Sequence, residues 1–190
     1  MSIAHEVVVK QYDKGAFIHH RGDEAKGYYG LISGRVRVSA TTLDGKASTV
    51  HFFNSGDWFG EISLIDGIAR THDADTTEDT HILILPKSTF EQHLMSDAES
   101  LKQLAIGLCQ RLRMSFQFIE ESTTQTLAAR LANRLLTLHP NTQQVSQQEL
   151  AQMLGVSRQS VSKQLQQWEE SHWIKIQYNG LSILNHNALT

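Results

Sequence analysis

The stretch from Asp57 to Asp75, DWFGEISLIDGIARTHDAD, combines a Gly-Glu pair with an Arg-Thr pair in a segment that otherwise resembles strands and tight turns. Arg70 follows Glu61 by nine residues. A guanidinium can pair with an anion such as a phosphate, and an ionised carboxylate accepts hydrogen bonds. Neither group belongs in a plain β core, because a buried charge is costly unless it is paired. The stretch therefore indicates either a ligand site or an ion pair that caps a β-sandwich.

A second group of polar residues could read nucleic acid. In SQQELAQMLGVSRQSVSKQLQQWEESHWI, a short helix from about Gln147 to Leu154 is followed by a Gly-Val-Ser turn and a helix that starts near Arg158. Gly155 opens the turn and Ser157 can cap the second helix, which is helix-turn-helix spacing. Ala151, Val156, Val161 and Leu165 would be buried, whereas Arg158, Gln159, Ser160 and Lys163 would lie on the exposed outer face. The alternative is a helical hairpin with solvated polar residues.

Short β-rich runs surround the Gly-Glu pair. Nine of the twelve glycines fall between Gly15 and Gly67, where they punctuate runs such as GAFIHH, YYGLIS, GRVRVSA and STVHFF. The Asp-Gly turn of LDGK, at 43–46, is typical of a tight hairpin, and THILILP reads as a last, buried strand. Many short strands with frequent turns predict a sandwich, jelly roll or barrel of about 85 residues.

A long helix is predicted after the β module, because apolar and small residues recur there at alternating spacings of four and three, the seam of a coiled coil. The seam consists of Leu101, Ala105, Leu108, Leu112, Ser115, Ile119, Ser122 and Thr126. The alternative is a single helix that packs this stripe on its own sheet, but the helix is too long for a small sheet to cover, which favours a partner helix. A further helix from about Gln125 to Leu138 follows, and KIQYNGLSIL resembles the two strands of a wing.

Charge and cysteine content narrow the class of protein. Residues 1–100 hold nine Lys and Arg against fifteen Asp and Glu, whereas residues 101–190 hold eight against five. An acidic first half and a mildly basic second half suggest two modules, of which the second could approach a polyanion. Cys109 is the only cysteine, which excludes an internal disulfide and an iron–sulfur cluster. No apolar run reaches the roughly 18 to 20 residues that cross a bilayer, so we expect a cytoplasmic protein with no membrane partner.

The order of β module, long helix and helix-turn-helix resembles the CRP/FNR family of bacterial transcription regulators over almost the whole chain. The specific motifs are GRVRV, FGEISLIDGIART and LGVSRQSVSK. The resemblance implies an α+β fold with an N-terminal β jelly roll or double-stranded β-helix, a long dimerisation helix and a C-terminal winged helix-turn-helix. It implies a cyclic-nucleotide-binding-like sensor domain at 1–98, the dimerisation helix at 99–124 and the DNA-binding domain at 125–190. The family usually has a helix before the first strand, whereas about six residues precede VVVKQY here.

The resemblance also implies a ligand for the Gly-Glu and Arg-Thr cassette. In cyclic-nucleotide-binding members, the Arg pairs with the cyclic phosphate, backbone N–H groups of a short helix meet it, and the Glu accepts from the ribose 2′-hydroxyl. Thr71 would add a hydroxyl or N–H to the phosphate, and Ser115 would face the adenine. The implied effector residues are Gly60, Glu61, Ile62, Ser63, Arg70, Thr71 and Ser115. The implied effector is cyclic AMP or another cyclic nucleotide.

Four residues depart from the pattern that the resemblance implies. His72 and Asp73 follow the Arg-Thr pair where the family commonly has Ala, which puts a titratable pair beside the phosphate. Ser115 supplies one of the two adjacent hydroxyls that the long helix offers to the adenine, and Phe116 replaces the other. Phe116 could stack on a base or fill the pocket, which would make the chain an unliganded or differently liganded regulator. Gln159 stands where the best-known member has Glu.

By the same resemblance, Arg158 occupies the family's guanine-reading position. Gln159 can donate and accept as adenine N6 and N7 require, and Ser146, Gln147 and Lys163 would hold phosphates or flanking base edges. The implied DNA-binding residues are Ser146, Gln147, Ser157, Arg158, Gln159, Ser160 and Lys163. In a dimer with two-fold symmetry, the two helix-turn-helix domains would bind double-stranded DNA at an inverted repeat, with RNA polymerase as a further partner.

The prediction is a homodimeric, sequence-specific transcription regulator controlled by a small effector, with no catalytic residue, metal or iron–sulfur cluster. One alternative is a cyclic-nucleotide-binding regulatory protein that controls a protein partner without DNA, which the helix-turn-helix disfavours. The other is a cupin-like metal enzyme, since the chain has ten histidines. His19 and His20 are adjacent in a predicted strand and point to opposite faces, which argues against a shared metal site.

Overall fold

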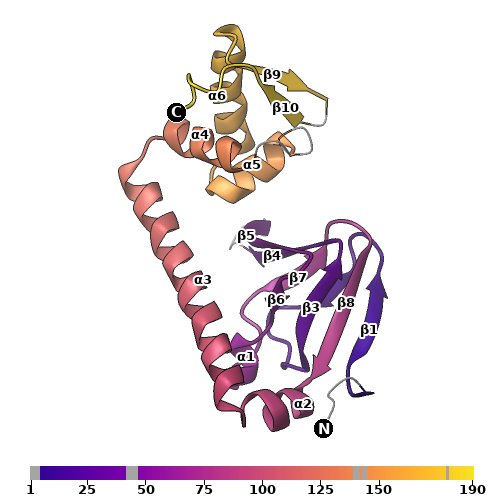
Figure 1. The fold of residues 1–190 in the computed structure, drawn as a ribbon. Coiled ribbons are helices and arrows are strands. Elements are labelled where there is room, and N and C mark those ends of the chain that lie inside the picture. Colours follow the sequence, from indigo (N-terminus) through magenta and orange to yellow (C-terminus); the bar gives the residue numbers. More distant parts are fainter. Residues whose placement is uncertain (1–4, 42–46, 139–141, 143–144, 179) are drawn as a thin grey trace. The chain divides into compact units, whose positions relative to one another are not determined.

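The computed structural model describes residues 5–41, 47–138, 142, 145–178 and 180–190. The chain divides into a first unit, Met1–Leu108, and a second unit, Cys109–Thr190. The boundary falls within the long helix α3 (Ala98–Thr124) (Figure 1). The finer division at 98 and 124 stays a prediction. The hairpin turn predicted at 43–46 lies outside the described residues.

Two four-stranded antiparallel sheets form most of the first unit (Figure 1). Their strands are β1 (Val8–Tyr12), β2 (Phe17–His19), β3 (Gly27–Ser33), β4 (Arg35–Thr41), β5 (Ala47–Asn54), β6 (Trp58–Phe59), β7 (Asp73–Thr76) and β8 (Thr80–Pro86). The strand order is β1-β8-β3-β6 in one sheet and β2-β7-β4-β5 in the other. Strands distant in the chain therefore pair, which gives the predicted jelly roll. Each of the five predicted runs contributes a strand.

The core of the first unit is built from the inward-facing side chains of these strands. Val36, Ala74 and Ile82 are fully buried there. Successive side chains of a strand alternate between its two faces, so each strand contributes only every second residue. Phe59 lies between two other rings, with centroids 4.9 Å from Phe53 and 5.2 Å from Tyr29. This aromatic packing fixes Tyr29, which faces the candidate site.

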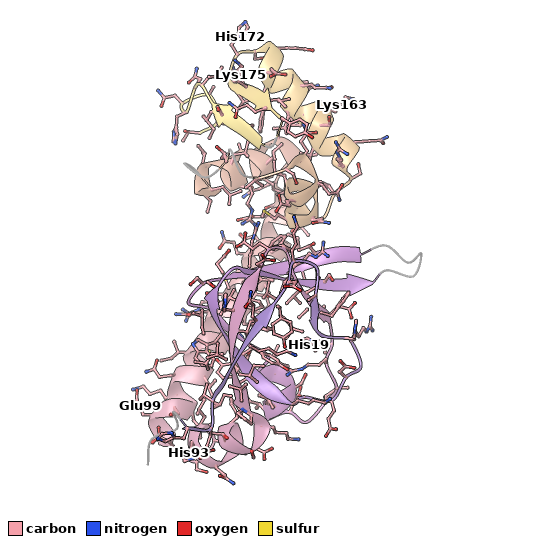
Figure 2. The ribbon with its side chains drawn as sticks, turned by 90° about the vertical axis from the view of Figure 1, so that its right-hand side faces the viewer. His19, His93, Glu99, Lys163, His172 and Lys175 are labelled. Atoms are coloured by element: carbon pink, nitrogen blue, oxygen red, sulfur yellow. The ribbon has the colours of Figure 1, made fainter. Side chains whose placement is uncertain are left out.

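Glu6 anchors the start of the described chain to the first unit. Its carboxylate accepts a hydrogen bond from Thr89 Oγ1 at 2.7 Å and lies 3.9 Å from Nε2 of His93 (Figure 2). Strand β1 then pairs with β8, with Val8 opposite Ile84. The first strand is thus held by residues of α2 (Lys87–Thr89) and of the π-helical segment η2 (Phe90–Leu94).

Helix α3 leaves most of its apolar side chains exposed in the described part of the chain, although Leu104 packs against the core of the first unit. Asp97 starts the helix by accepting a hydrogen bond from the N–H of Ser100 at 2.8 Å. The helix has 27 residues, none of them buried, and spans about 40 Å. Leu112 and Ile119, on the predicted seam, are 54% and 56% exposed. The seam is shorter than predicted, because α3 ends at Thr124 and its last expected member, Thr126, lies beyond the helix.

The second unit contains the predicted helix-turn-helix and wing (Figure 1). Its elements are α4 (Leu127–Leu138), α5 (Gln147–Leu154), α6 (Arg158–Glu170), β9 (Ile174–Gln177) and β10 (Gly180–Ile183). Ala151, Val161 and Leu165 are buried in one core with Trp168, as predicted, and Val156 packs against it. Strands β9 and β10 pair antiparallel and form the wing.

Two local signals position the helices of this motif. Gly155 ends α5 with a φ of +65°, a conformation that favours glycine. Ser157 caps α6 by accepting a hydrogen bond from the N–H of Ser160 at 3.1 Å. Both roles were predicted from the sequence, because they depend on neighbouring residues only.

Candidate functional site

Arg70 is a buried cation in the first unit, with only 4% of the residue exposed. Its Nη1 donates to the carbonyl of Gly60 at 2.6 Å, and its Nη2 donates to the carbonyl of Gly27 at 2.8 Å. Its Nε has no hydrogen-bond partner among the described residues. Arg70 makes no ion pair with a carboxylate in the described part of the chain, so the ion pair with Glu61 considered above is not formed. The guanidinium keeps hydrogen-bonding capacity for an anion.

Gly60 lets the backbone come close to this guanidinium. Its φ is +93°, and a Cβ there would lie 2.9 Å from Cδ2 of Tyr29 and 3.0 Å from Nη1 of Arg70. Glu61 follows, 2% exposed, and is the N-cap of the short helix α1 (Ile62–Ile65). The Glu61 carbonyl accepts hydrogen bonds from the N–H groups of Leu64 and Ile65. The N–H groups of Ile62 and Ser63, at the start of the helix, therefore have no acceptor within the helix.

Two aromatic rings complete the wall around Arg70. The guanidinium carbon lies 5.4 Å from the ring centroid of Tyr29, and the ring of His19 (Figure 2) lies 6.0 Å from that of Tyr29. Burial, and secondarily the charge of Arg70, lowers the pKa of His19 from 6.5 to about 4. Burial raises the pKa of Tyr29 above its ordinary value. Both rings are therefore neutral near pH 7, and Arg70 supplies positive charge.

Thr71 lies exposed directly after Arg70 and contacts a histidine. Its Oγ1 is 2.8 Å from Nδ1 of His72. Asp73, the first residue of β7, accepts a hydrogen bond from the N–H of Arg21 at 2.8 Å and lies 3.6 Å from Nδ1 of His20. Burial, and then the charge of Arg21, lowers the pKa of His72 from its ordinary value.

Six of the seven predicted effector residues lie in the stretch 60–71 of the first unit, where Gly60 contacts Arg70 directly. Within it Ser63 is buried, whereas Ile62 is 50% exposed. Ser115 lies on α3 in the second unit, where its hydroxyl donates to the carbonyl of Arg111 at 3.0 Å. Its place at the effector site stays a prediction.

Sequence reasoning missed two neighbours of Arg70. Tyr29 could have been found, because the alternation along YYGLIS turns it to the same side as Leu31 in the core. The carbonyl of Gly27 carried no signal, since a backbone acceptor 43 residues from Arg70 is brought there only by the strand order.

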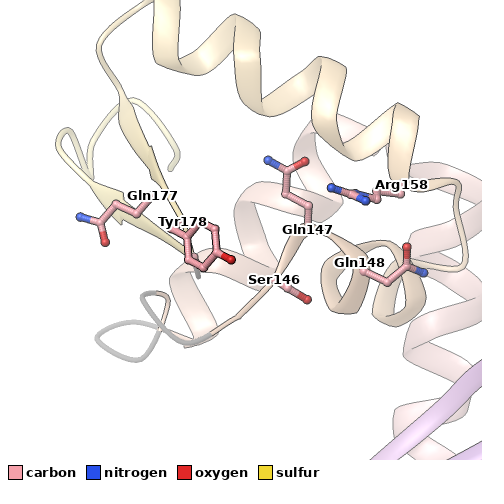
Figure 3. Close-up of a pocket in the computed structure, with 7 residues that line it drawn as sticks. Ser146, Gln147, Gln148, Arg158, Gln177 and Tyr178 are labelled. Atoms are coloured by element: carbon pink, nitrogen blue, oxygen red, sulfur yellow. The ribbon is translucent and has the colours of Figure 1, made fainter.

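The second unit carries a hollow of about 260 Å³ between the start of α5, the start of α6 and the wing. It is lined by Ser146, Gln147, Gln148, Arg158, Gln177, Tyr178 and Gly180. In Figure 3, Gln147 and Arg158 lie on one side of this hollow and Tyr178 on the other. Ser146 is held by a capping box, in which its Oγ accepts from the N–H of Glu149 and the Glu149 carboxylate accepts from the N–H of Ser146.

The outer face of α6 is polar and open to solvent. Arg158, Gln159, Ser160 and Lys163 are all exposed there; Lys163 is marked in Figure 2. The hydroxyl of Ser157 is engaged in the helix cap and lies 2.8 Å from that of Ser160. The wing strands were predicted from the sequence, but Gln177 and Tyr178 were not singled out as surface residues of the hollow. Tyr178 is fully exposed at the end of the wing hairpin. The roles of these residues toward DNA stay predictions.

Among the residues with described positions, no group of three or more His, Cys, Asp or Glu is arranged to hold a metal ion. In that same part of the chain, none of the helices is both long and apolar enough to span a bilayer.

The two units together define a class of protein, a DNA-binding regulator with a β-roll module before a winged helix-turn-helix. Residues 9–97 match the cyclic nucleotide-binding domain and residues 129–190 match the Crp-like helix-turn-helix domain. The cyclic AMP receptor protein of Thermus thermophilus is 30% identical over 169 residues, which cover 87% of this chain and 78% of that protein. The chain belongs to the CRP/FNR family of bacterial transcription regulators.

Other relatives and solved structures agree with this assignment. A CRP-like cAMP-activated global transcriptional regulator of Mycobacterium tuberculosis is 26% identical over 184 residues, covering 91% of this chain and 81% of the relative. A CRP-family transcriptional regulator from Thermus thermophilus superposes with a TM-score of 0.78 at 29% identity, covering 95% of this chain and 94% of that one. FixK2 from Bradyrhizobium japonicum has a TM-score of 0.82 at 21% identity, with 96% and 95% covered, and supports the fold alone.

Proposed function

We propose that the chain is a homodimeric transcription regulator switched by a small anionic effector, and that this effector is a cyclic nucleotide, with cyclic AMP the first to test. The observation that carries the proposal is the buried guanidinium of Arg70, whose Nε–H is unused and which has no carboxylate partner among the described residues. A buried charge is stable only when it is compensated. A phosphate compensates it and accepts the remaining N–H groups.

Neighbouring residues favour a nucleotide over a simple anion. Glu61 is buried beside Gly60, and a carboxylate repels phosphate but accepts hydrogen bonds from sugar hydroxyls. This pairing of a cation and an anion within one cassette fits a ligand that has both a phosphate and a ribose. The names of the relatives, a cyclic AMP receptor protein and a cAMP-activated regulator, support the same choice.

For the DNA-binding unit, we propose that α6 reads base edges and that the hollow beside the wing receives the DNA backbone. Arg158 is exposed at the start of α6 and presents a planar donor pair suited to guanine. Two such units in a dimer would bind an inverted repeat with half-sites about 34 to 36 Å apart. A contact with RNA polymerase and a cytoplasmic location stay predictions.

Calorimetric titration of the full-length protein with cyclic AMP and with cyclic GMP tests the effector. We expect saturable heat with one of them. Absence of heat with both at millimolar concentration would contradict the effector proposal.

Selection of DNA from a random library, with and without the nucleotide, tests the second unit separately. We expect an inverted repeat that is enriched more strongly with the effector. A pool without an inverted repeat would contradict the proposed mode of DNA binding while leaving the effector result intact.

A further inference from the structure

We propose that His72 is an additional effector-site residue, which couples binding of the effector's phosphate to uptake of a proton. The inference rests on the proposed function, because it concerns the same site. His72 is also one of the residues by which this chain departs from the pattern that the resemblance implies, in which Ala commonly follows the Arg-Thr pair.

The geometry at Thr71 sets up this coupling. Oγ1 of Thr71 lies 2.8 Å from Nδ1 of His72, so one hydrogen is shared between the two atoms. When Nδ1 carries no proton, the hydroxyl must donate to it and turns its lone pairs outward. When Nδ1 is protonated, the imidazole donates to Oγ1, and the hydroxyl hydrogen is released toward a third group.

A phosphate diester favours the arrangement in which Nδ1 of His72 is protonated and donates to Oγ1 of Thr71. Its anionic oxygens only accept hydrogen bonds, so Thr71 can contact them only if its hydroxyl hydrogen points to them. Thr71 is exposed and follows the buried Arg70 directly, which makes the hydroxyl accessible to a ligand whose phosphate is paired with Arg70. A fully protonated imidazole also adds a positive charge beside the anion, whereas the neutral Nδ1–H form does not.

The groups around His72 lower its pKa and so favour the neutral imidazole at pH 7 and above in the free protein. Burial and the positive charge of Arg21 lower its pKa, and the negative charge of Asp73 opposes them in part. Nδ1 of His20 lies 3.6 Å from that carboxylate. The pKa of His19 is about 4, so His19 stays neutral between pH 6 and 8. A phosphate would add a negative charge on the side of Thr71 and favour the imidazolium.

The sign of the pH dependence follows from this linkage. The ligand raises the pKa of His72 above its value in the free protein, so binding is tightest below the free pKa. The gain is lost as the pH rises through the pKa of the complex. Affinity should therefore increase from pH 8 to pH 6, up to about tenfold for each unit by which the ligand raises the pKa.

Calorimetry with cyclic AMP at pH 6, 7 and 8, in two buffers of different ionisation enthalpy, measures affinity and proton uptake together. Wild type should bind more tightly at pH 6 and take up protons on binding. His72→Gln keeps a donor for Thr71 without a titratable charge, so its affinity should be nearly independent of pH. Thr71→Val should bind more weakly and with a smaller pH slope.

The control is His81→Gln. His81 makes a matched contact elsewhere in the first unit, with its Nδ1 3.1 Å from Oγ of Ser33. Its replacement should leave both the affinity and the pH slope unchanged. If His72→Gln fails to fold, NMR of histidine-labelled wild type replaces it, and one histidine pKa should rise when cyclic AMP is added.

The outcomes separate the two proposals. Equal affinity of wild type at pH 6 and 8, an unchanged slope in His72→Gln, or no histidine pKa that moves would overturn the role of His72 and leave the effector proposal standing. Absence of cyclic AMP binding at every pH would overturn the effector proposal, and the inference with it.

Discussion

At the residue scale, Arg70 has a structural role and a proposed role in effector binding, and substitutions can separate them. Arg70→Ala should lower effector affinity about 10- to 150-fold, because it removes a charge-assisted pair worth about 1.5 to 3 kcal/mol. It should also lower the free energy of unfolding by about 1 to 3 kcal/mol, because the carbonyls of Gly60 and Gly27 lose their donors. Calorimetry with the nucleotide and urea unfolding without it measure the two effects.

Arg70→Lys is the matched control for this pair of measurements. It keeps the charge, but a single ammonium lacks the rigid fork that reaches two separate carbonyls. Its stability should therefore fall much as in Arg70→Ala, while part of the effector affinity is retained. Wild-type affinity in Arg70→Ala would show that the phosphate binds elsewhere.

Gln159 should set the base preference next to the guanine that Arg158 is proposed to read. A neutral amide can donate and accept as adenine requires, whereas a glutamate accepts from the cytosine amino group. Gln159→Glu should therefore shift selection from a random library at one position per half-site. Arg158→Ala should lose about 1 to 3 kcal/mol of discrimination at the neighbouring position. If Gln159→Glu and wild type select the same bases, Gln159 does not read DNA.

The turn of the helix-turn-helix gives a prediction at the element scale. Gly155→Ala should lower the free energy of unfolding by about 1 to 2 kcal/mol, because its φ of +65° is unfavourable for a residue with a Cβ. The new Cβ would meet Cζ of Phe118 at 3.7 Å, an ordinary contact, so crowding is not the cause. Urea unfolding followed by circular dichroism measures the change.

Two further variants test whether the left-handed backbone conformation of Gly155 causes the loss of stability, or whether any replacement of a flexible glycine by alanine would. Gly155→Asn should cost less than Gly155→Ala, because asparagine tolerates the left-handed conformation. Gly107→Ala, inside α3 with no atom within 4 Å of the added Cβ, should be neutral or stabilising by up to about 1 kcal/mol. Equal destabilisation by both alanine variants would contradict the conformational argument.

The same elements show how far a sequence determines this molecule. Gly155 and Ser157 were recognised from sequence, because a turn and a helix cap depend on residues that adjoin in the chain. The surroundings of Arg70 were not recognised, because Tyr29 and the carbonyl of Gly27 reach it only through the pairing of distant strands. The end of the seam was misplaced because polar residues such as Ser122 and Thr126 fit the spacing without showing where α3 stops.

At the scale of the whole molecule, we propose that the exposed stripe of α3 packs against a second copy of the chain. Leu112 is 54% exposed and lies at the centre of the predicted seam. In a two-fold dimer it would meet its symmetry mate, and each buried leucine would contribute about 1.5 to 3 kcal/mol. Leu112→Arg should therefore weaken dimerisation at least about a hundredfold, since both copies are changed. Leu108→Arg, one turn earlier, should act in the same direction.

Met114→Arg is the matched control for the dimer interface. Met114 is 51% exposed on the same helix but, two residues on, points about 200° away from Leu112. Sedimentation velocity should therefore find wild type and Met114→Arg as dimers and Leu112→Arg as a monomer. Leu112→Arg should lose affinity for an inverted repeat. It should still bind a single half-site as weakly as wild type does, because the helix-turn-helix domain of each chain stays intact. If Met114→Arg dissociates and Leu112→Arg does not, the two chains meet along a different face of α3.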